Sequence, residues 1–334
     1  MSSTPERGLS GTSIGLRARR GTLNRVVCFV LLVLFLRPVR STLPGAGEQS
    51  FAHPAEWVVR IVRRAPRSVV KNGSDLQRAA DNGMVGVLLS FQNTSAFDDD
   101  IRFVRLYSEL GVRVVQLTYN TQNSVGAGCY EANDSGLTEY GALLVREMND
   151  CGMLIDVSHC GDKTALDAVA VSRTPVVITH ANLRKFADKT RNKSDDVCRA
   201  IADNGGIIGL ATYSNLLPRG GDTSIEEFCD LVEATVDLVG IDHVGLGTDY
   251  YDGMPPEMVI GWTTGRWSRT VPAHMDLAGA GWNGELPPHT DWFKSPRDMP
   301  NVTRALQLRG FDDKSVAAIM GGNWVRLMND VFGA

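Results

Sequence analysis

The chain has 334 residues, of which 43% are hydrophobic, so it is long and apolar enough to bury a large globular core. Its 34 basic and 38 acidic residues are interspersed and give a net charge of −4, so no nucleic-acid partner is expected. The six cysteines form no Cys-x-x-Cys pair, which argues against a zinc ribbon or a disulfide framework and predicts buried free thiols.

The first fifty residues differ in kind from the rest. Basic residues flank an apolar run of eleven residues at 26–36 (VVCFVLLVLFL). A membrane-spanning helix needs about 20 residues, whereas this run has the length of a signal-peptide core or a marginal anchor. We therefore expect a targeting or anchor segment over 1–50 and a folded domain over 51–334. With such a segment the protein is secreted or anchored to a membrane through residues 26–36, and without one it is cytoplasmic. The alternatives for this run are a buried core strand and a sequence start that does not belong to the folded domain.

From residue 85 onward, short apolar runs alternate with longer segments of helical period, which is typical of β/α units around a parallel sheet. Strands are expected at 85–91, 113–119, 153–159, 175–180, 206–212 and 243–249. Helices are expected at 98–110, 136–150, 162–172, 194–204, 223–239, 312–320 and 323–332. No convincing strand is found between residues 41 and 84. The predicted fold class is α/β, a TIM-like (β/α)8 barrel that is incomplete or divergent at its first β/α unit.

Polar residues close the predicted strands at the end where such barrels carry their chemistry. His159, His180 and Asp249 are each the last residue of a predicted strand, and Gln92 and Asn120 each lie one residue beyond one. Two neutral imidazoles and a carboxylate are what a hydrolytic zinc site needs, because imidazoles bind the cation and a carboxylate moves protons. The sequence therefore predicts a metal site at this end.

Two other polar residues of the same strands are not expected in this cluster. Asp156 lies three residues before His159 and therefore points to the opposite face of an ideal strand. His243 shares a face with Asp249 but lies about 20 Å further down the strand. Neither is predicted to belong to the site.

Six blocks of the sequence follow one another with a characteristic order and spacing. They are LLSFQNTSAF, LYSELGVRVVQLTYNTQN, GLTEYGALLVREMNDCGMLIDVSHCG, PVVITHANLRKFADKTRNKSDD, VGIDHVGLGTDYYDG and IMGGNWVRLM. Over roughly residues 75 to 332, this pattern resembles the membrane (renal) dipeptidase family of zinc metallopeptidases. The resemblance implies an amidohydrolase-like barrel with two zinc ions, which cleaves dipeptides by attack of a metal-bridging hydroxide on the peptide carbon. A dipeptide or another small amide is then the expected substrate. The protein could form a homodimer.

The resemblance also implies roles for individual residues. His159 and His180 match the two histidine ligands of the second metal, and Asp249 matches the acid that passes a proton from the water to the leaving amine. Compared with the family pattern, one residue is inserted between Asp249 and Asp252, so both acids remain candidates for this role. The position at the end of a predicted strand favours Asp249. Arg191 matches the arginine that holds the substrate's terminal carboxylate, a task that suits a bidentate guanidinium; a solvated loop arginine is the alternative.

Three positions depart from the family pattern. The family's first strand ends in a His-x-Asp pair that binds the first metal; none is found near the start of this barrel, where His53 and Glu56 have a different spacing. Gln92 stands at the position of the metal-bridging glutamate. Tyr119 replaces a histidine that helps to bind the scissile group, and it is expected with Asn120 at the substrate.

These departures affect the expected number of metal ions. A neutral amide supplies no charge to offset the repulsion between two dications, so the first metal site is expected to be impaired. His159, His180 and Gln92 would still hold one Zn²⁺, completed by Asp249 or by water, and one such ion is sufficient for hydrolysis. The leading hypothesis is a zinc-dependent dipeptidase with one or two ions. The alternatives are a catalytically impaired relative that only binds a ligand, and a single-metal hydrolase of N-acyl amino acids or lactones.

Overall fold

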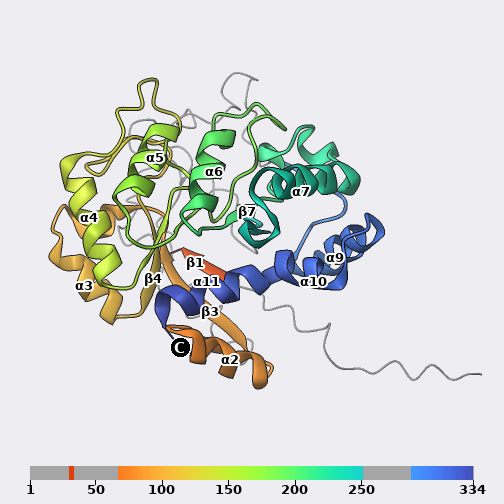
Figure 1. Ribbon diagram of the computed structural model, residues 1–334, viewed down its shortest axis with the longest axis horizontal. Helices are drawn as coiled ribbons and strands as arrows, with labels where there is room; N and C mark the ends of the chain where they lie inside the picture. Colours follow the sequence, from red (N-terminus) through yellow and green to blue (C-terminus); the bar gives the residue numbers. More distant parts are fainter. Residues whose placement is uncertain (1–29, 34–66, 251–286, 334) are drawn as a thin grey trace, which may run out of the picture.

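The computed structural model describes residues 30–33, 67–250 and 287–333, in which short strands form the centre and helices cover them (Figure 1). The strands are β1 (Val30–Val33), β2 (Arg67–Val69), β3 (Val85–Phe91), β4 (Val112–Gln116), β5 (Leu154–Asp156), β6 (Val176–Val177), β7 (Ile208–Leu210) and β8 (Val244–Leu246). The α-helices are α2 (Gly73–Asp81), α3 (Arg102–Glu109), α4 (Glu139–Asp150), α5 (Asp162–Val171), α6 (Asp195–Asp203), α7 (Ile225–Val239), α9 (Met299–Leu308), α10 (Asp313–Ala317) and α11 (Asn323–Phe332).

The strands pair in parallel, as the alternation of apolar runs and helices predicts. One sheet has the order β1-β3-β4-β5-β6, with β2 also paired to β3, and β7 pairs with β8. A parallel bridge between Ile178 and Ile208 links the two sheets just beyond β6. Figure 1 shows α3 to α7 following one another around the outside of these strands. The α/β class is confirmed, and within the described ranges no pairing of β8 with β1 or β2 closes a barrel.

Five strands end earlier than the sequence predicts: β4, β7 and the three that precede His159, His180 and Asp249. β5, β6 and β8 end three residues before His159, His180 and Asp249, respectively. The prediction that these residues close the strands is therefore wrong by three positions, and all three lie on the loops that leave the strands.

A side chain takes over the backbone donors at the end of β5. The Asp156 carboxylate accepts hydrogen bonds from the backbone N–H groups of Ser158 at 2.9 Å and Thr179 at 3.0 Å. In a continued ladder these donors would pair with carbonyl groups of neighbouring strands. The regular pairing of β5 with β6 therefore stops here, and the loops that follow are held by side chains.

Two elements before residue 85 are absent from the sequence-based prediction. β2 has only three residues, which is too short to show an alternation, and α2 begins after Asn72, whose side chain accepts from the backbone N–H of Asp75. β2 pairs with residues 85–87 of β3, and β1 pairs with residues 87–90 of the same strand. Part of the apolar run at 26–36 thus forms a strand of the sheet, as the alternative interpretation of this run expects. That residues 1–50 are a targeting segment stays a prediction.

Hydroxyl residues cap the starts of three of the helices that follow the strands. Ser224 opens α7 with a capping box, in which its hydroxyl accepts from the Glu227 N–H and the Glu227 carboxylate accepts from the Ser224 N–H. Thr138 and Ser194 cap α4 and α6 by accepting from backbone N–H groups. In a β/α unit the start of the helix follows the loop at the end of the strand. These caps therefore help to fix the loops that carry the candidate site.

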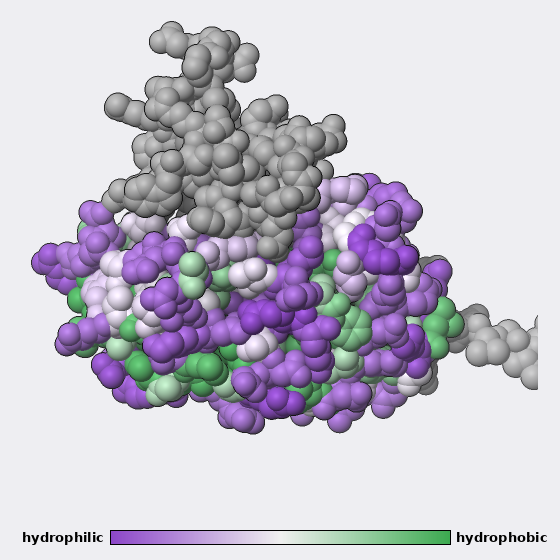
Figure 2. Space-filling view, turned by 90° about the horizontal axis from the view of Figure 1, so that it is seen from above, coloured by the Kyte–Doolittle hydropathy of each residue, from purple (hydrophilic) through white to green (hydrophobic). Residues whose placement is uncertain are grey.

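The thiols and the surface fit a globular protein. The cysteines of the described ranges are all free, and four of them are buried: Cys129, Cys160, Cys198 and Cys229. Figure 2 shows apolar residues in green interspersed with hydrophilic residues in purple on the visible face. Among the residues that the structure describes, none of the helices combines the length and the apolar character required to span a membrane.

β8 leaves the sheet at Gly247, which touches the neighbouring loop so closely that only glycine fits. A Cβ at this position would lie 1.8 Å from the carbonyl oxygen of Thr179 and 3.0 Å from that of Gly209. We expect Gly247→Ala to lower the free energy of unfolding by about 3 kcal/mol, because both obstructing atoms belong to the backbone. Gly220 has open space around it and a φ of +60°, so Gly220→Ala should cost only about 1 kcal/mol. Urea unfolding of both variants measures the difference, and equal losses would contradict the predicted steric conflict.

Candidate metal centre

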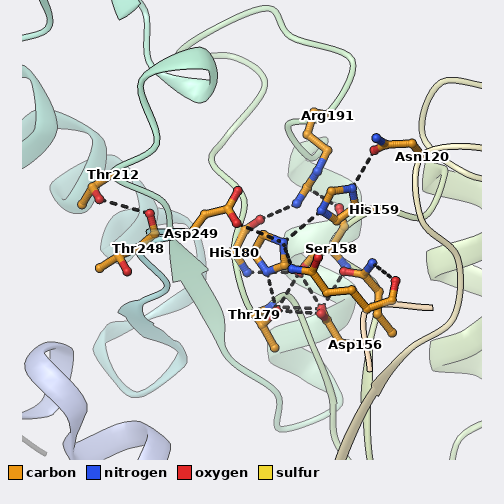
Figure 3. Close-up of polar contacts among 12 residues, drawn as sticks. Asn120, Asp156, Ser158, His159, Thr179, His180, Arg191, Thr212, Thr248 and Asp249 are labelled. Atoms are coloured by element: carbon orange, nitrogen blue, oxygen red, sulfur yellow. Dashed lines mark hydrogen bonds and ion pairs between the residues drawn. The ribbon is translucent and has the colours of Figure 1, made fainter. Parts of the chain in front are cut away.

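The structure brings His159 and His180 together at the ends of β5 and β6 (Figure 3). Their Nε2 atoms lie 3.0 Å apart, and both side chains are buried. Burial holds the pKa of both rings well below the ordinary value, and the charge of Arg191 lowers it further. Both imidazoles are therefore neutral near pH 7, which is the form that binds a metal ion.

Hydrogen bonds to the other ring nitrogens indicate where the protons lie. His180 Nδ1 is 2.7 Å from Thr179 Oγ1, and that hydroxyl donates its proton to the Asp156 carboxylate at 2.6 Å. His180 Nδ1 must therefore be the donor to Thr179. His159 Nδ1 is 2.6 Å from Asn120 Oδ1, which accepts its proton. Each Nε2 is left with a lone pair, and the two lone pairs face each other.

This pair of nitrogens fits a divalent cation. Two lone pairs at 3.0 Å repel each other unless a proton or a cation lies between them. Two nitrogen ligands of a tetrahedral Zn²⁺, each at about 2.0–2.1 Å, would stand about 3.3 Å apart. The Gln92 amide nitrogen lies 3.5 Å from His180 Nε2, so this side chain reaches the same place. In the part of the chain that the structure describes, no group of three or more His, Cys, Asp or Glu side chains is arranged to hold a metal ion.

Asp249 lies at the same end, on the loop after β8. Its Oδ1 is 3.8 Å from His180 Nε2, and its side chain is 26% exposed. The residue adopts a left-handed φ of +53°, a conformation that is uncommon outside glycine and frequent at functional sites. Thr212 donates to the carbonyl of Thr248 at 3.1 Å and so holds the chain just before it. Burial raises the pKa of Asp249 to about 7, so the group can accept and release a proton near neutral pH.

Tyr119 and Asn120, which the sequence assigns to the substrate, both contact His159. The Tyr119 ring stacks on the imidazole with a centroid distance of 4.4 Å and an interplanar angle of 21°. Asn120 adopts a left-handed φ of +64° that turns its side chain to the His159 Nδ1 proton. The two residues thus orient this ring, and their contact with a substrate stays a prediction.

Arg191 joins the loops that carry the two histidines. Its side chain is buried, its Nη1 donates to the carbonyl of Ser158, and its Nη2 donates to the carbonyl of His180 at 2.8 Å (Figure 3). Burial excludes the solvated loop arginine. A guanidinium has five N–H donors, so others remain for a substrate carboxylate, and that role stays a prediction.

Replacing this arginine should destabilise the protein. Arg191→Ala leaves two buried carbonyl groups without a donor, and we expect the free energy of unfolding to fall by about 3 kcal/mol. Arg199 on α6 is exposed, and Arg199→Ala should change the same quantity by less than about 0.5 kcal/mol. Denaturant titrations of the two variants test this difference. A variant Arg191→Ala as stable as Arg199→Ala would show that the two carbonyl contacts contribute nothing.

Asp156 belongs to the site, although the prediction from strand parity excludes it. Its carboxylate accepts from the hydroxyl groups of Ser158 at 2.5 Å and Thr179 at 2.6 Å. The parity argument is wrong here because β5 ends at Asp156 and the chain leaves strand geometry at once. A hydroxyl residue directly before each histidine is the sequence signal that points to this network. His243 bonds to the carbonyl of Gly206 at 2.8 Å and remains outside the cluster, as predicted.

Some candidate ligands lie outside the described residues. These are His53 and Glu56 near the start of the chain and the alternative acid Asp252. The sequence contains two His-x-Asp triplets, at 274–276 outside the described ranges and at 289–291 within them, and neither lies near the start of the barrel.

Comparison with known proteins identifies related sequences. A family model described as membrane dipeptidase (peptidase family M19) matches residues 46–264. A dipeptidase of Claviceps purpurea is 28% identical over 260 residues, which are 77% of this chain and 53% of that protein. An uncharacterized dipeptidase of Schizosaccharomyces pombe is 31% identical over 181 residues, which are 52% of this chain and 43% of that protein. The chain thus spans about half the length of these curated relatives.

Solved structures show the same fold. The crystal structure of an amidohydrolase from Pseudomonas aeruginosa is 33% identical, has a TM-score of 0.75, and is matched over 84% of this chain and 83% of that chain. A probable dipeptidase of the same organism has a TM-score of 0.67 at 22% identity, over 83% and 76% of the two chains. The match to the family model covers more than half of the sequence. This chain belongs to the membrane dipeptidase family, peptidase family M19.

Proposed function

We propose that this chain is a metal-dependent dipeptidase that hydrolyses the peptide bond of dipeptides at a single zinc site formed by His159 and His180. The observation that carries this proposal is the buried, neutral imidazole pair whose Nε2 lone pairs face each other across 3.0 Å. Membership of the dipeptidase family supports a small peptide as the substrate. When bound, a zinc ion supplies a Lewis acid that lowers the pKa of a water molecule.

The side chains of this chain account for the remaining steps. Asp249 accepts a proton from the attacking water and returns it to the leaving amine. Gln92 is a neutral neighbour of the cation, which favours one ion over two because no carboxylate stands at its position. Arg191 and Tyr119 bind the substrate's carboxylate and the scissile group, next to the imidazole pair.

A substrate panel with metal analysis tests this function. The purified chain is assayed with and without added zinc against L,L- and L,D-dipeptides, an N-acyl amino acid and a lactone, and bound metal is counted by elemental mass spectrometry. We expect about one zinc per chain and dipeptide hydrolysis that a chelator abolishes. Turnover of the acyl amino acid or the lactone alone would assign a single-metal hydrolase of another substrate class. Bound zinc without turnover of any substrate would contradict the proposal and indicate a binding protein.

We also propose that residues 1–50 direct the protein to a membrane or to secretion. The apolar run at 26–36 supports this proposal, and the pairing of β1 with β3 gives part of the same run a place in the sheet. N-terminal sequencing of the mature protein distinguishes the two roles. Cleavage after residue 36 would remove β1, whereas retention of the run in a soluble, active protein would contradict the targeting role.

A further inference from the structure

The Asp156 carboxylate receives four hydrogen bonds in the interior of the protein (Figure 3). Two come from the hydroxyl groups of Ser158 and Thr179, and two come from the backbone N–H groups of the same residues. Three of the four meet at Oδ1, and the Thr179 hydroxyl meets Oδ2. The side chain is 1% exposed, so water does not compete for these contacts.

This arrangement determines which nitrogen of His180 carries the proton. A carboxylate only accepts hydrogen bonds, so the single hydroxyl proton of Thr179 points to Asp156. Thr179 Oγ1 must then accept at its 2.7 Å contact with His180 Nδ1. The His180 proton is therefore held on Nδ1, and Nε2 keeps the lone pair that faces the cation position. Ser158 Oγ accepts from the His180 backbone N–H at 3.0 Å, so the same carboxylate also holds the backbone of this residue.

We propose that Asp156 is a positioning residue that sets the tautomer of His180 through Thr179 and thereby keeps Nε2 free to bind a divalent cation. Ligand histidines commonly give their second N–H to such a partner, and losing it costs about 10–100-fold in metal affinity. The proposal rests on the proposed function only in assuming that the bound group is a cation. The tautomer itself is a property of the metal-free protein.

An asparagine at this position should reverse the direction of the donors. The amide oxygen of Asp156→Asn stays at the Oδ1 position, because three donors converge there and an amide NH₂ would repel them. The amide NH₂ then occupies the Oδ2 position and donates to Thr179 Oγ1. The Thr179 proton then turns to its nearer remaining acceptor, His180 Nδ1 at 2.7 Å, and not to Ser158 Oγ at 3.1 Å, so the imidazole proton moves to Nε2. The variant keeps the shape of the side chain and removes the lone pair from the cation position.

The matched variants separate this effect from a general loss of stability. Thr179→Ser keeps the hydroxyl, and Thr179→Val removes it with little change of shape. Asp134 provides a control, because its carboxylate also accepts hydrogen bonds from a backbone N–H and a hydroxyl. The donors are the Lys163 N–H at 2.6 Å and the Thr164 hydroxyl at 2.9 Å. Asp134→Asn should weaken folding without changing the His180 tautomer.

Two measurements on the full chain test the proposal. The first is ¹⁵N NMR of the metal-free protein labelled at histidine, with the His180 signals assigned from their loss in His180→Ala. We expect the Nδ1–H form in the wild type, Thr179→Ser and Asp134→Asn, and the Nε2–H form in Asp156→Asn. The second is the zinc dissociation constant from competition with a chromogenic chelator. It should rise about 10–100-fold in Asp156→Asn and Thr179→Val and less than about 3-fold in the other two variants.

The outcomes separate this inference from the proposed function. A folded Asp156→Asn with the wild-type tautomer and zinc affinity would overturn the inference. Should that variant not fold, equal zinc affinity and equal His180 signals in Thr179→Ser and Thr179→Val would overturn it instead. A wild type that binds zinc but hydrolyses no substrate would defeat the proposed dipeptidase and leave the tautomer result standing. A wild type with the Nε2–H form of His180 would defeat the inference whatever its activity.

Discussion

Replacing Asp249 with asparagine is expected to lower kcat for dipeptide hydrolysis by about 10²–10⁴-fold, the usual contribution of a positioned acid or base. The amide cannot accept a proton from water or return it to the amine. Bound zinc should stay near one per chain, because the carboxylate oxygen lies 3.8 Å from His180 Nε2 and the imidazole pair remains. Steady-state kinetics with metal analysis measures both quantities.

The control for this variant lies at the other end of the same strand. Asp242 precedes β8 and is exposed, so Asp242→Asn should leave kcat within about 2-fold of the wild type. If Asp249→Asn retained the wild-type kcat with its zinc in place, another acid would have to move the proton, and Asp252 would be the first to examine.

The raised pKa of Asp249 also makes the stability of the metal-free protein depend on pH. The folded protein holds this proton up to a pKa of about 7, whereas an ordinary aspartate releases it near 3.8. The folded state therefore binds more protons than the unfolded state between these values, and its stability falls as the pH rises from about 4 to about 7. In Asp249→Asn this contribution disappears. Urea unfolding of both metal-free proteins at pH 4.5 and 7.5 measures it, and a stability difference between the two proteins that does not change with pH would contradict the assignment.

Removing either histidine of the pair should abolish metal binding and, with it, hydrolysis. His159→Ala and His180→Ala each leave one imidazole, so the zinc dissociation constant should rise by more than the 10–100-fold that the loss of a ligand's hydrogen-bond partner costs. Bound zinc should fall from about one per chain to near zero after dialysis. Both variants should lose more activity than Asp249→Asn, because they lose the ion itself.

His243 provides the matched control for these two variants. It directly precedes β8, and its ring bonds to the carbonyl of Gly206 just before β7, so it lies at the start of these strands and not at their carboxyl ends. His243→Ala should therefore keep its zinc and its kcat. Equal zinc in His180→Ala and His243→Ala would place the cation elsewhere in the protein.

The sequence predicts the repeating β/α pattern well, because each unit carries its own local signals. β3 has the predicted bounds, since a run of seven apolar and small residues ends at a change of composition. α7 begins at Ile225, within two residues of the predicted start at 223 and with the predicted end at 239, since the capping box of Ser224 is a contact between residues three positions apart. Such features depend on neighbouring residues alone.

Features that depend on distant residues are harder to predict. The ends of β5 and β6 follow from the Asp156 carboxylate, which takes backbone donors from Ser158 and Thr179 on two loops, 21 positions apart in the sequence. β2 has only three residues, and it is a strand because it pairs with β3 and not because of its own sequence pattern. Arg191 reads as a loop residue in the sequence, but its two carbonyl contacts come from loops that only the fold brings together.

The candidate site shows the same division. The resemblance to the family picks out His159, His180 and Asp249, and the structure places all three at one end of the sheet. The hydrogen bonds that hold the two imidazole rings were not part of the prediction. Thr179 and Asn120 orient the two rings from different strands, and this orientation decides which nitrogen atoms face the cation position.

X-ray absorption at the zinc edge tests most directly whether the two histidines share one cation. The zinc-loaded wild type should contain one ion per chain with two imidazole nitrogens among its nearest neighbours, completed by oxygen and without sulfur. The double variant His159→Ala/His180→Ala should bind no zinc under the same conditions. A wild-type spectrum with sulfur ligands, or a double variant that retains zinc with an unchanged spectrum, would contradict the site described above.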